Sequence, residues 1–445
     1  MSSELRKLWE HAGGQLPDDW SIVSFESLLR DKKSIAVGVM YPGPDTPGGV
    51  PLLKVGDVKD GSVPKKPSYC ISAETDEEHK RTKLIGDELL ITLVGNPGEC
   101  VVVNQKMAGW NPARAIAVAR LQDPSLRTYI KTVLESTAGR HLVDAVLNTT
   151  VQKTLNLKDI RKLPIPLPSS ATIKGISSFS EALTMRITLL RETNATLEAI
   201  AQALFKSWFV DFDPVHAKAE GRQPEGMDAT NAALFPDSFE DSELGLVPKG
   251  WRVGSIYEIA RVIYGAPFAS KQFNTEKLGL PLIRIRDLKD EQPGVYTEEV
   301  HSKGYLTQPG DIVVGMDGEF RSYIWGGEPA WLNQRVCVFK PNTGYSSAFV
   351  NYTIKPQLAL VEATEIATTV IHLGKNDIDR FTALIPNGRI TSAYSDVANP
   401  IYAKIVEGKQ KAQTLTQLRD TLLPRLISGQ LRLPEAEALV EALPA

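Results

Sequence analysis

The chain has little cysteine, no long apolar run and no signature of catalysis, and each absence narrows what the protein can be. Its three cysteines, Cys70, Cys100 and Cys337, are scattered, with neither a CxxC pair nor a histidine at zinc-binding spacing. This arrangement predicts buried free thiols, not a disulfide framework or a structural metal site. No apolar run reaches the about 18 residues that a membrane helix needs, and the N-terminal MSSELRKLWEHAGG lacks the apolar core of a signal peptide. We therefore expect a cytoplasmic protein with no membrane partner.

Motifs that carry chemistry are also missing. The sequence has no phosphate-binding G-x-x-x-x-G-K-[ST] loop, no dinucleotide-binding G-x-G-x-x-G after a strand and no G-x-S-x-G nucleophile elbow. The strings nearest to the N-P-P-[YF] motif of amino-methyltransferases begin at Asn96 and Asn111 and depart from it at once. Asp211 and Asp213 have no third carboxylate or histidine beside them to complete a metal site. The sequence predicts neither catalytic nor metal-binding residues in this chain.

Charge neither demands nor forbids a polyanionic partner. The 445 residues carry a net charge of −3, and 42% of them are hydrophobic, which is ordinary for a globular protein. Residues 211–246 hold nine acidic side chains against Lys218 and Arg222, so the rest of the chain is mildly basic.

The most informative feature of the sequence is an internal repeat. The phrase GVPLLKVGDVKD at residues 49–60 returns as GLPLIRIRDLKD at 279–290. Four further matches keep the same order: LPDDWSIVSFESLLR (16–30) with VPKGWRVGSIYEIAR (247–261), GDELLITLVG (86–95) with GDIVVGMDG (310–318), NPARAIAV (111–118) with NQRVCV (333–338), and TVQKTLNLKDI (150–160) with TTVIHLGKNDI (368–378). The period is far longer than that of a solenoid or propeller. The chain is therefore a tandem of two large related units.

Each unit is expected to be mixed α and β. Short β-branched runs bounded by Gly, Pro or Asp, such as ELLITLV, CVVV and RVCVF, predict strands, and SLRTYIKTVLEST (125–137) predicts a helix among them. There is no regular βαβ alternation. We expect an α+β fold.

A long amphipathic helix is predicted after each unit. Between Ile176 and Phe209 there is no Gly or Pro. Apolar side chains and Asn194 recur there at alternating steps of four and three, over roughly 50 Å of helix; the seam is Leu183, Ile187, Leu190, Asn194, Leu197, Ala201, Leu204 and Trp208. In the second helix, Leu415, Leu418 and Leu422 keep this spacing, but Gly408 and Pro424 are expected to weaken it.

Each helix can pack on its own domain, or the two can pair with each other. The narrow stripe favours an antiparallel coiled coil related by a pseudo-two-fold axis, with Asn194 setting the register. The predicted order is an α/β domain (1–168), a helix (169–210), an acidic linker (211–246), a second α/β domain (247–388), a helix (389–431) and a tail (432–445).

Two similar domains on a rigid spacer suit a ligand that presents two binding sites at a fixed separation. Double-stranded DNA presents half-sites at multiples of a helical turn of about 34 Å. Because the two units differ in detail, we expect a bipartite, asymmetric site with an unread gap.

Two stretches resemble a known family. LEAIAQALFKSWFVDFDPVHAKAEGR (197–222) resembles the central region of type I restriction-modification specificity subunits, and LRDTLLPRLISGQL (418–431) resembles their C-terminal helix. The resemblance implies two target recognition domains joined by two antiparallel helices. It also implies a complex with two methyltransferase (modification) subunits for adenine-N6 methylation, and with restriction (translocase and endonuclease) subunits for cleavage. Catalysis, S-adenosylmethionine, ATP and Mg²⁺ would then belong to the partners.

Candidate DNA-binding residues are basic, amide or tyrosine side chains near strand ends and in Gly-rich loops. Arg and Lys suit guanine, Asn and Gln suit adenine, and all of them can grip phosphates. The candidates in the first unit are Lys54, Lys59, Asn111 and Arg114, and those in the second are Arg284, Arg286, Lys289, Arg321, Tyr323, Gln334 and Arg335. For each, an ordinary solvated charge or a structural ion pair is the competing interpretation.

Phe205, Trp208 and Phe209 near the end of the first helix are candidates for docking a methyltransferase subunit if they are exposed, although core packing is favoured for Trp208. Two other functional classes stay open from the sequence. One is a scaffold whose domains bind only proteins. The other is a hydrolase whose catalytic groups leave no motif.

Overall fold

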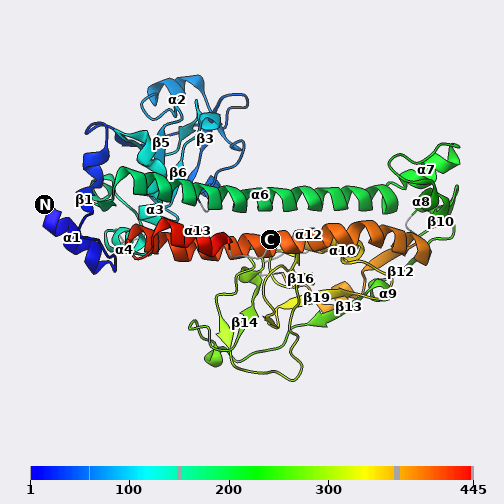
Figure 1. Ribbon diagram of the computed structural model, residues 1–445. Helices are drawn as coiled ribbons and strands as arrows, with labels where there is room; N and C mark the ends of the chain where they lie inside the picture. The colour runs from blue at the N-terminus through cyan, green and yellow to red at the C-terminus, as the bar shows by residue number, and fades with distance from the viewer. Residues whose placement is uncertain (1, 60, 148–152, 244, 365–370, 442–445) are drawn as a thin grey trace. The chain divides into compact units, whose positions relative to one another are not determined.

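A computed structural model describes residues 2–59, 61–147, 153–243, 245–364 and 371–441. The chain forms two compact units. Unit 1 contains Met1–Arg186 and Leu415–Ala445, and unit 2 contains Ile187–Thr414. Two 40-residue helices, α6 (Ser170–Phe209) and α12 (Gly388–Ile427), contribute residues to both units, and Figure 1 shows each as one continuous helix.

Unit 1 is built on three small sheets. Their strand orders are β2-β8-β5-β6, β4-β3-β7 and β1-β9. The strands are β1 (Ser21–Ser24), β2 (Ile35–Val37), β3 (Val50–Leu53), β4 (Cys70–Ile71), β5 (Glu88–Thr92), β6 (Cys100–Val102), β7 (Asn111–Pro112), β8 (Ile116–Arg120) and β9 (Pro164–Leu167). The α-helices are α1 (Ser2–His11), α2 (Ala73–Glu78), α3 (Arg127–Glu135), α4 (Thr137–Ala145), α5 (Leu157–Ile160) and α13 (Leu433–Glu441). Helix α3 packs against β5 and β6.

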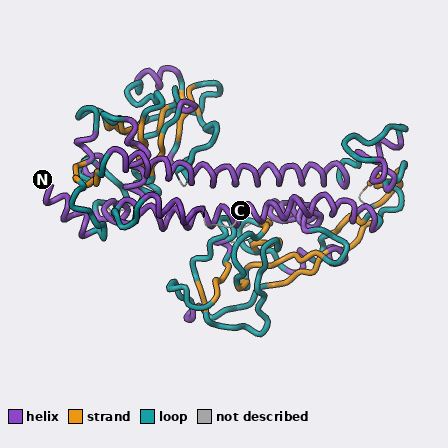
Figure 2. The backbone as a smooth tube through the Cα atoms, in the orientation of Figure 1, coloured by secondary structure: helices purple, strands orange, loops and turns teal. Residues whose placement is uncertain are grey.

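Unit 2 repeats this topology. Three of its sheets have the strand orders β13-β19-β16-β17, β15-β14-β18 and β12-β20, and the fourth is described below. The strands are β12 (Arg252–Ser255), β13 (Ala260–Tyr264), β14 (Leu280–Ile283), β15 (Tyr296–Thr297), β16 (Ile312–Gly315), β17 (Ser322–Ile324), β18 (Trp331–Leu332), β19 (Val336–Pro341) and β20 (Thr382–Ile385). The α-helices are α9 (Ile256–Ile259), α10 (Ser347–Thr364) and α11 (Lys375–Ile378). Figure 2 shows strands, helices and loops in both units. The mixed α and β character expected from the sequence is confirmed.

The repeated phrase has the same local structure in both units. In unit 1 it forms β3 and the 3₁₀ turn η2 (Val55–Asp57), and in unit 2 it forms β14 and η6 (Ile285–Asp287). An aspartate closes each turn, because the Lys54 amide donates to Asp57 Oδ2 at 2.9 Å and the Arg284 amide donates to Asp287 Oδ2 at 3.0 Å. Three parts of the sequence matches, Asp60, 150–152 and 368–370, lie outside the described residues.

Within unit 2, α6 and α12 run antiparallel. The Asn194 side chain donates from Nδ2 to the carbonyl of Ile405 at 3.1 Å, and Tyr394 Oη donates to the carbonyl of Ala201 at 3.4 Å. Partner numbers fall along α12 as they rise along α6, so the two helices have opposite directions. Asn194, at a seam position, is buried and hydrogen-bonded to the facing helix, as a register-setting residue must be.

Gly408 allows α6 and α12 to approach closely, whereas the sequence predicts that it weakens the second helix. The helix α12 continues through both Gly408 and Pro424 to Ile427. A Cβ at Gly408 would lie 2.4 Å from Asn194 Oδ1, so only glycine leaves room for the asparagine between the helices. The conformational cost of glycine within a helix is offset by this close approach.

The first turns of α6 pack in unit 1. Thr128 Oγ1 on α3 donates to Glu181 Oε1 at 2.5 Å, and Thr132 Oγ1 donates to Ser180 Oγ at 3.2 Å. Each end of α6 therefore contacts the α/β part of the unit to which it belongs, in addition to the antiparallel contact with α12 seen in unit 2.

The acidic segment 211–246 is more than a connector. It folds into α7 (Asp213–Ala219), α8 (Ala229–Leu234) and β10 (Phe239–Ser242), and β10 pairs with β11 (Gly245–Pro248). Phe235 is 2% exposed and lies edge-on to Trp208, with ring centroids 5.2 Å apart. The segment therefore covers part of the unit 2 core. Along the described residues, no helix is both long enough and apolar enough to cross a bilayer.

Candidate nucleic-acid interface

Parallel strand pairs place the candidate residues of each unit together. In unit 1, β3 runs parallel to β7, with Leu53 opposite Pro112. In unit 2, β14 runs parallel to β18, with Ile283 opposite Leu332. Because parallel strands end at the same edge, the segments that follow them lie side by side. We call residues 54–59 with 113–115 loop pair 1, and residues 284–289 with 333–335 loop pair 2.

Loop pair 1 presents two exposed cations. Lys59 is exposed in a tight turn in which its backbone pairs with Ser62. Arg114 is exposed, while its backbone amide donates to the carbonyl of Val39 at 2.9 Å. Lys54 is half-buried, with Nζ 3.4 Å from the centre of the Tyr69 ring, which is a cation–π contact. Lys59 and Arg114 are free to meet a ligand, and Lys54 is partly engaged within the unit.

Asn111 does not have the position expected of a base-reading side chain. It is 0% exposed, accepts a hydrogen bond from Thr82 Oγ1 at 3.0 Å and donates to Asp76 Oδ1 on α2 at 2.7 Å. Its amide is satisfied inside unit 1, so the expectation of a DNA contact is wrong for this residue. Buried strand residues with polar side chains are paired internally, and one sequence cannot show with which partner.

Replacing Asn111 by alanine will cost stability without changing any DNA preference of the folded protein. The change leaves the Asp76 carboxylate and the Thr82 hydroxyl short of a partner in a buried site, at a cost of about 2–4 kcal/mol. Denaturant unfolding measures the loss. Arg114→Ala is the matched exposed variant and should leave the unfolding midpoint unchanged. An Asn111→Ala protein of normal stability with altered DNA selection would contradict the buried position.

Loop pair 2 presents four exposed side chains, Arg286, Lys289, Gln334 and Arg335. Arg284 is instead held by Asp287, with Nε 3.0 Å from Oδ2 in a pair that is mostly buried. This pair closes the η6 turn that carries Arg286. The sequence groups Arg284 with Arg286, Lys289 and Gln334 as candidates, whereas the structure shows that Arg284 shapes the turn and the other three are exposed.

Arg335 is exposed but belongs to a small charged cluster. Its Nε lies 3.5 Å from Asp317 Oδ2, and His372 Nδ1 lies 2.6 Å from Asp317 Oδ1. The Met316 amide donates to the Arg335 carbonyl at 3.0 Å, which sets the cluster beside the end of β16. Arg335 is therefore an exposed residue of loop pair 2 with part of its charge neutralised.

Arg321, directly before β17, and Tyr323, within β17, have different surroundings. Arg321 is ion-paired with Glu362 on α10, and this hydrogen-bonded pairing raises the pKa of Arg321 and lowers that of the Glu362 carboxyl. Tyr323 is half-buried and packs on the cluster that contains Leu288, and burial raises its pKa. Tyr323 borders loop pair 2, whereas Arg321 is held at α10.

A buried ion pair anchors the chain that follows loop pair 2. Lys409 Nζ on α12 lies 2.8 Å from Glu291 Oε1 and also donates to the carbonyl of Ile324 at 2.8 Å. Burial raises the pKa of Glu291, and the nearby ammonium opposes that rise. Helix α12 thus fixes the position of Glu291, which follows Lys289 by two residues in the sequence.

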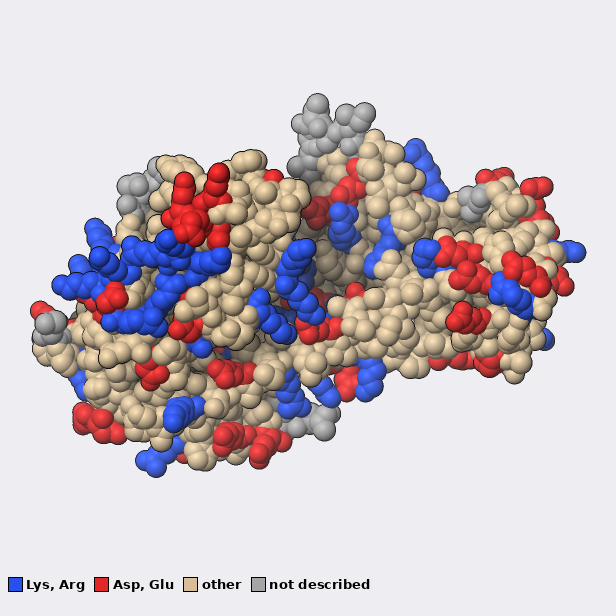
Figure 3. All heavy atoms as spheres, turned by 90° about the horizontal axis from the view of Figure 1, so that it is seen from above, with Lys and Arg blue, Asp and Glu red and all other residues tan. Residues whose placement is uncertain are grey.

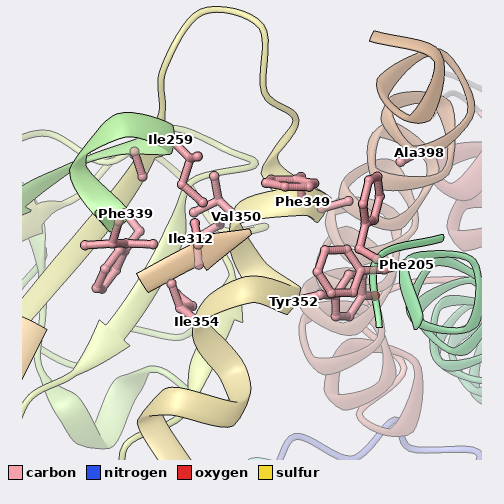
Figure 4. Packing of buried hydrophobic residues seen from close by; sticks show 14 of the residues in the cluster. Phe205, Ile259, Ile312, Phe339, Phe349, Val350, Tyr352, Ile354 and Ala398 are labelled. Atoms are coloured by element: carbon pink, nitrogen blue, oxygen red, sulfur yellow. The ribbon is translucent and has the colours of Figure 1, made fainter. Parts of the chain in front are cut away.

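The three aromatic residues expected at a docking surface are in the core. Phe205, Trp208 and Phe209 are buried and pack against rings from α10, α12 and the segment around Trp251. Figure 4 shows Phe205 facing Phe349 and Tyr352 on α10. The expected exposure is therefore wrong, because the helix face that looks free in the sequence is covered by unit 2 itself. The core interpretation holds for Trp208.

A cationic surface on unit 1 was not singled out from the sequence. Figure 3 shows Lys and Arg gathered in a band on this unit, bordered by acidic side chains. Arg120 donates to the carbonyls of Arg81 at 2.6 Å and Lys83 at 2.8 Å, and Arg161 donates to that of Lys32 at 2.6 Å. These guanidinium groups mainly brace the backbone. Arg120 lies at the opposite end of β8 from Arg114.

The cysteines are free. Cys100 and Cys337 are buried, as predicted, and Cys70 is only half-buried. Burial raises the pKa of both buried thiols, that of Cys337 to about 12. No group of His, Cys, Asp or Glu that could hold a metal ion occurs among the described residues.

Two units of the same strand order, each with exposed cationic side chains on a loop pair, define a protein with an internal duplication. Residues 248–420 match the family described as Type I restriction modification DNA specificity domain. The chain is related to the specificity subunits of type I restriction enzymes, and the resemblance noted in its sequence is confirmed.

Two curated relatives support this assignment. The chain is 25% identical over 363 residues to the Type I restriction enzyme HindI specificity subunit of Haemophilus influenzae, covering 68% of this chain and 74% of that one. It is 30% identical over 186 residues to the Type I restriction enzyme EcoBI specificity subunit of Escherichia coli, covering 41% and 39%. The fold is similar to the crystal structure of a type I restriction-modification S subunit from M. genitalium, with a TM-score of 0.51 and 16% identity over 93% of this chain and 97% of that chain.

Proposed function

We propose that the chain is the DNA-reading subunit of a type I restriction-modification complex and recognises a bipartite, asymmetric sequence in double-stranded DNA. Residues 1–168 would read one half-site and residues 247–388 the other. Loop pairs 1 and 2 are the proposed reading surfaces, with Lys59 and Arg114 in the first and Arg286, Lys289 and Gln334 in the second.

One observation carries this proposal. The same parallel strand pair, β3–β7 in unit 1 and β14–β18 in unit 2, delivers exposed cationic or amide side chains at its end. Long basic and amide side chains on a protruding loop are the groups that read guanine and adenine edges in the major groove. Because the side chains differ between the units, each loop pair would favour a different short sequence.

The helices α6 and α12 are the proposed spacer between the two readers. Their antiparallel contact in unit 2, with Asn194 against Ile405, gives a stiff element of defined register. A stiff spacer supports a fixed number of unread base pairs between the half-sites. The boundaries 169–210 and 389–431 for the spacer helices, 211–246 for the acidic segment and 432–445 for the tail are part of this proposal.

Partner subunits would supply the chemistry. Two modification subunits would bind this chain and methylate adenine at N6 with S-adenosylmethionine, and restriction subunits would add ATP- and Mg²⁺-dependent cleavage. The relationship to specificity subunits supports this division of labour. The complex would act in the cytoplasm, where it meets DNA.

Selection from a random pool of DNA duplexes tests the proposal. The full-length chain, in complex with the subunits that co-purify with it, is mixed with the pool, and bound duplexes are sequenced over several rounds. We expect one motif made of two short blocks separated by a constant number of random positions. A pool that shows no enrichment would instead favour a scaffold that binds only proteins.

A further inference from the structure

An unusually exposed aromatic residue stands beside loop pair 1. Tyr41 is 78% exposed, and among the large apolar and aromatic side chains of the described residues only Val300, at 80%, exceeds it. Single exposed apolar residues are common on protein surfaces, but tyrosine is also enriched among the residues that carry most of the binding energy at interfaces.

The loop that carries Tyr41 is stiff. Residues 42–47 include three prolines, and the loop is tied to the start of β4. The Cys70 amide donates to Asp45 Oδ1 at 2.9 Å, the Thr46 amide donates to the carbonyl of Cys70 at 3.0 Å, and Tyr69 Oη donates to the carbonyl of Gly43. The exposed position of Tyr41 is therefore built into the fold, which lowers the entropy cost of any contact it makes.

Backbone pairing brings this loop to loop pair 1. Val39 forms a parallel bridge to Ala113, and its carbonyl accepts the amide of Arg114. Gly38 permits this approach, since a Cβ there would lie 2.0 Å from the carbonyl oxygen of Pro112. Tyr41 follows Val39 by two residues, so the backbone of Tyr41 lies within two residues of the contact with Arg114.

The residue of unit 2 that corresponds to Tyr41 is buried and is not available to a ligand. Gly265 and Ala266 repeat the pairings of Gly38 and Val39, with Ala266 bridged to Asn333, which places Phe268 at the position of Tyr41. Phe268 is 7% exposed and packs against Trp331, with ring centroids 5.6 Å apart. The two units therefore differ in kind at this position, one aromatic ring facing outward and the other filling the core.

We propose that Tyr41 makes an apolar contact to a base of the half-site that unit 1 reads, next to the polar contact of Arg114. Aromatic rings pack on base faces and on thymine methyl groups, or wedge into a base step, and such contacts sit beside a basic side chain that holds the backbone. Unit 2 has no equivalent, so only one half-site would be read in this way. This inference rests on the proposed function, and it names a residue that sets specificity within it.

Three forms of the full-length complex, wild type, Tyr41→Ala and Tyr41→Phe, are passed through the same selection from random duplexes. We expect Tyr41→Ala to lose preference at one or two positions of one block and to bind the wild-type motif about 10-fold or more weakly. The other block should be unchanged. Tyr41→Phe should keep the wild-type motif, because it keeps the ring. Val300→Ala is the matched control, an equally exposed apolar residue of unit 2, and should alter neither block.

The outcomes separate this inference from the proposed function. If wild type selects two blocks and Tyr41→Ala selects the same two with unchanged affinity, the base contact is overturned while the proposed function stands. If Tyr41→Ala loses its co-purifying subunits but keeps its DNA preference, Tyr41 belongs to a protein interface and the inference is also overturned. Absence of any motif for wild type removes both. Because Tyr41 is highly exposed, its replacement should not impair folding. Circular dichroism checks the fold of each variant.

Discussion

Replacing both Arg286 and Lys289 with alanine will abolish selection of one block of the motif and leave the other block intact. Arg286 is exposed on the η6 turn of loop pair 2 and Lys289 is exposed two residues after it, and the turn itself is held by Arg284 and Asp287, which the change does not touch. A good side chain–base contact is worth about 1–3 kcal/mol. Affinity for the full motif should therefore fall about 10- to 100-fold or more.

A matched variant tests whether the loss comes from removing positive charge alone. Lys249→Ala with Arg389→Ala removes the same two positive charges from exposed positions of unit 2 outside loop pair 2. We expect this control to weaken binding to all sequences slightly and equally, because phosphate contacts carry no sequence preference. Equal loss of both blocks in the Arg286/Lys289 variant would contradict reading by loop pair 2.

Gly408→Ala will destabilise the protein by about 2–4 kcal/mol, although alanine favours a helix over glycine by about 1 kcal/mol. The new methyl group would lie 2.4 Å from Asn194 Oδ1 in a buried contact. Asn194 would have to leave its hydrogen bond to Ile405, and a buried amide without partners costs about 1–3 kcal/mol. Denaturant unfolding of the full chain measures the effect.

A second substitution identifies the cause of this loss. Asn194→Ala vacates the space that the methyl group needs, so the double variant should recover most of the stability lost in Gly408→Ala. Gly388→Ala is the control in the same helix, since a Cβ there meets nothing within 4 Å. Additive losses for Asn194→Ala and Gly408→Ala would show that the two residues do not share one contact.

Much of the architecture was predictable because it depends on local patterns. The duplicated phrase, the short β-branched strands and the alternating four–three spacing of the α6 seam are written in consecutive residues, and each has one dominant structural meaning. Asn194 was recognised as a register residue because a polar side chain within an apolar seam is rarely explained otherwise. The segment 211–246 was read as a linker from its composition, and its packing through Phe235 was missed.

The candidate site was predictable as a region and less so as a set of side chains. Arg286, Lys289 and Arg114 are exposed as expected, but Arg284 and Arg321 are engaged with Asp287 and Glu362, which lie nearby in space and at different distances in the sequence. Exposure of a polar side chain depends on which other chain segment arrives next to it. A single sequence records the side chain and not its neighbour.

The sequence by itself determined the tandem of two related α/β units, their long helices and the relationship to specificity subunits, because repeats, periodicity and motifs are properties of residue order. Only the tertiary structure decided that Asn111 and the aromatic trio at Phe205, Trp208 and Phe209 are internal, and that Gly408 makes room for Asn194. It also decided that Tyr41 faces outward while Phe268 is covered. Each of these results depends on contacts between segments far apart in the chain, where packing and hydrogen-bond satisfaction select one neighbour among many.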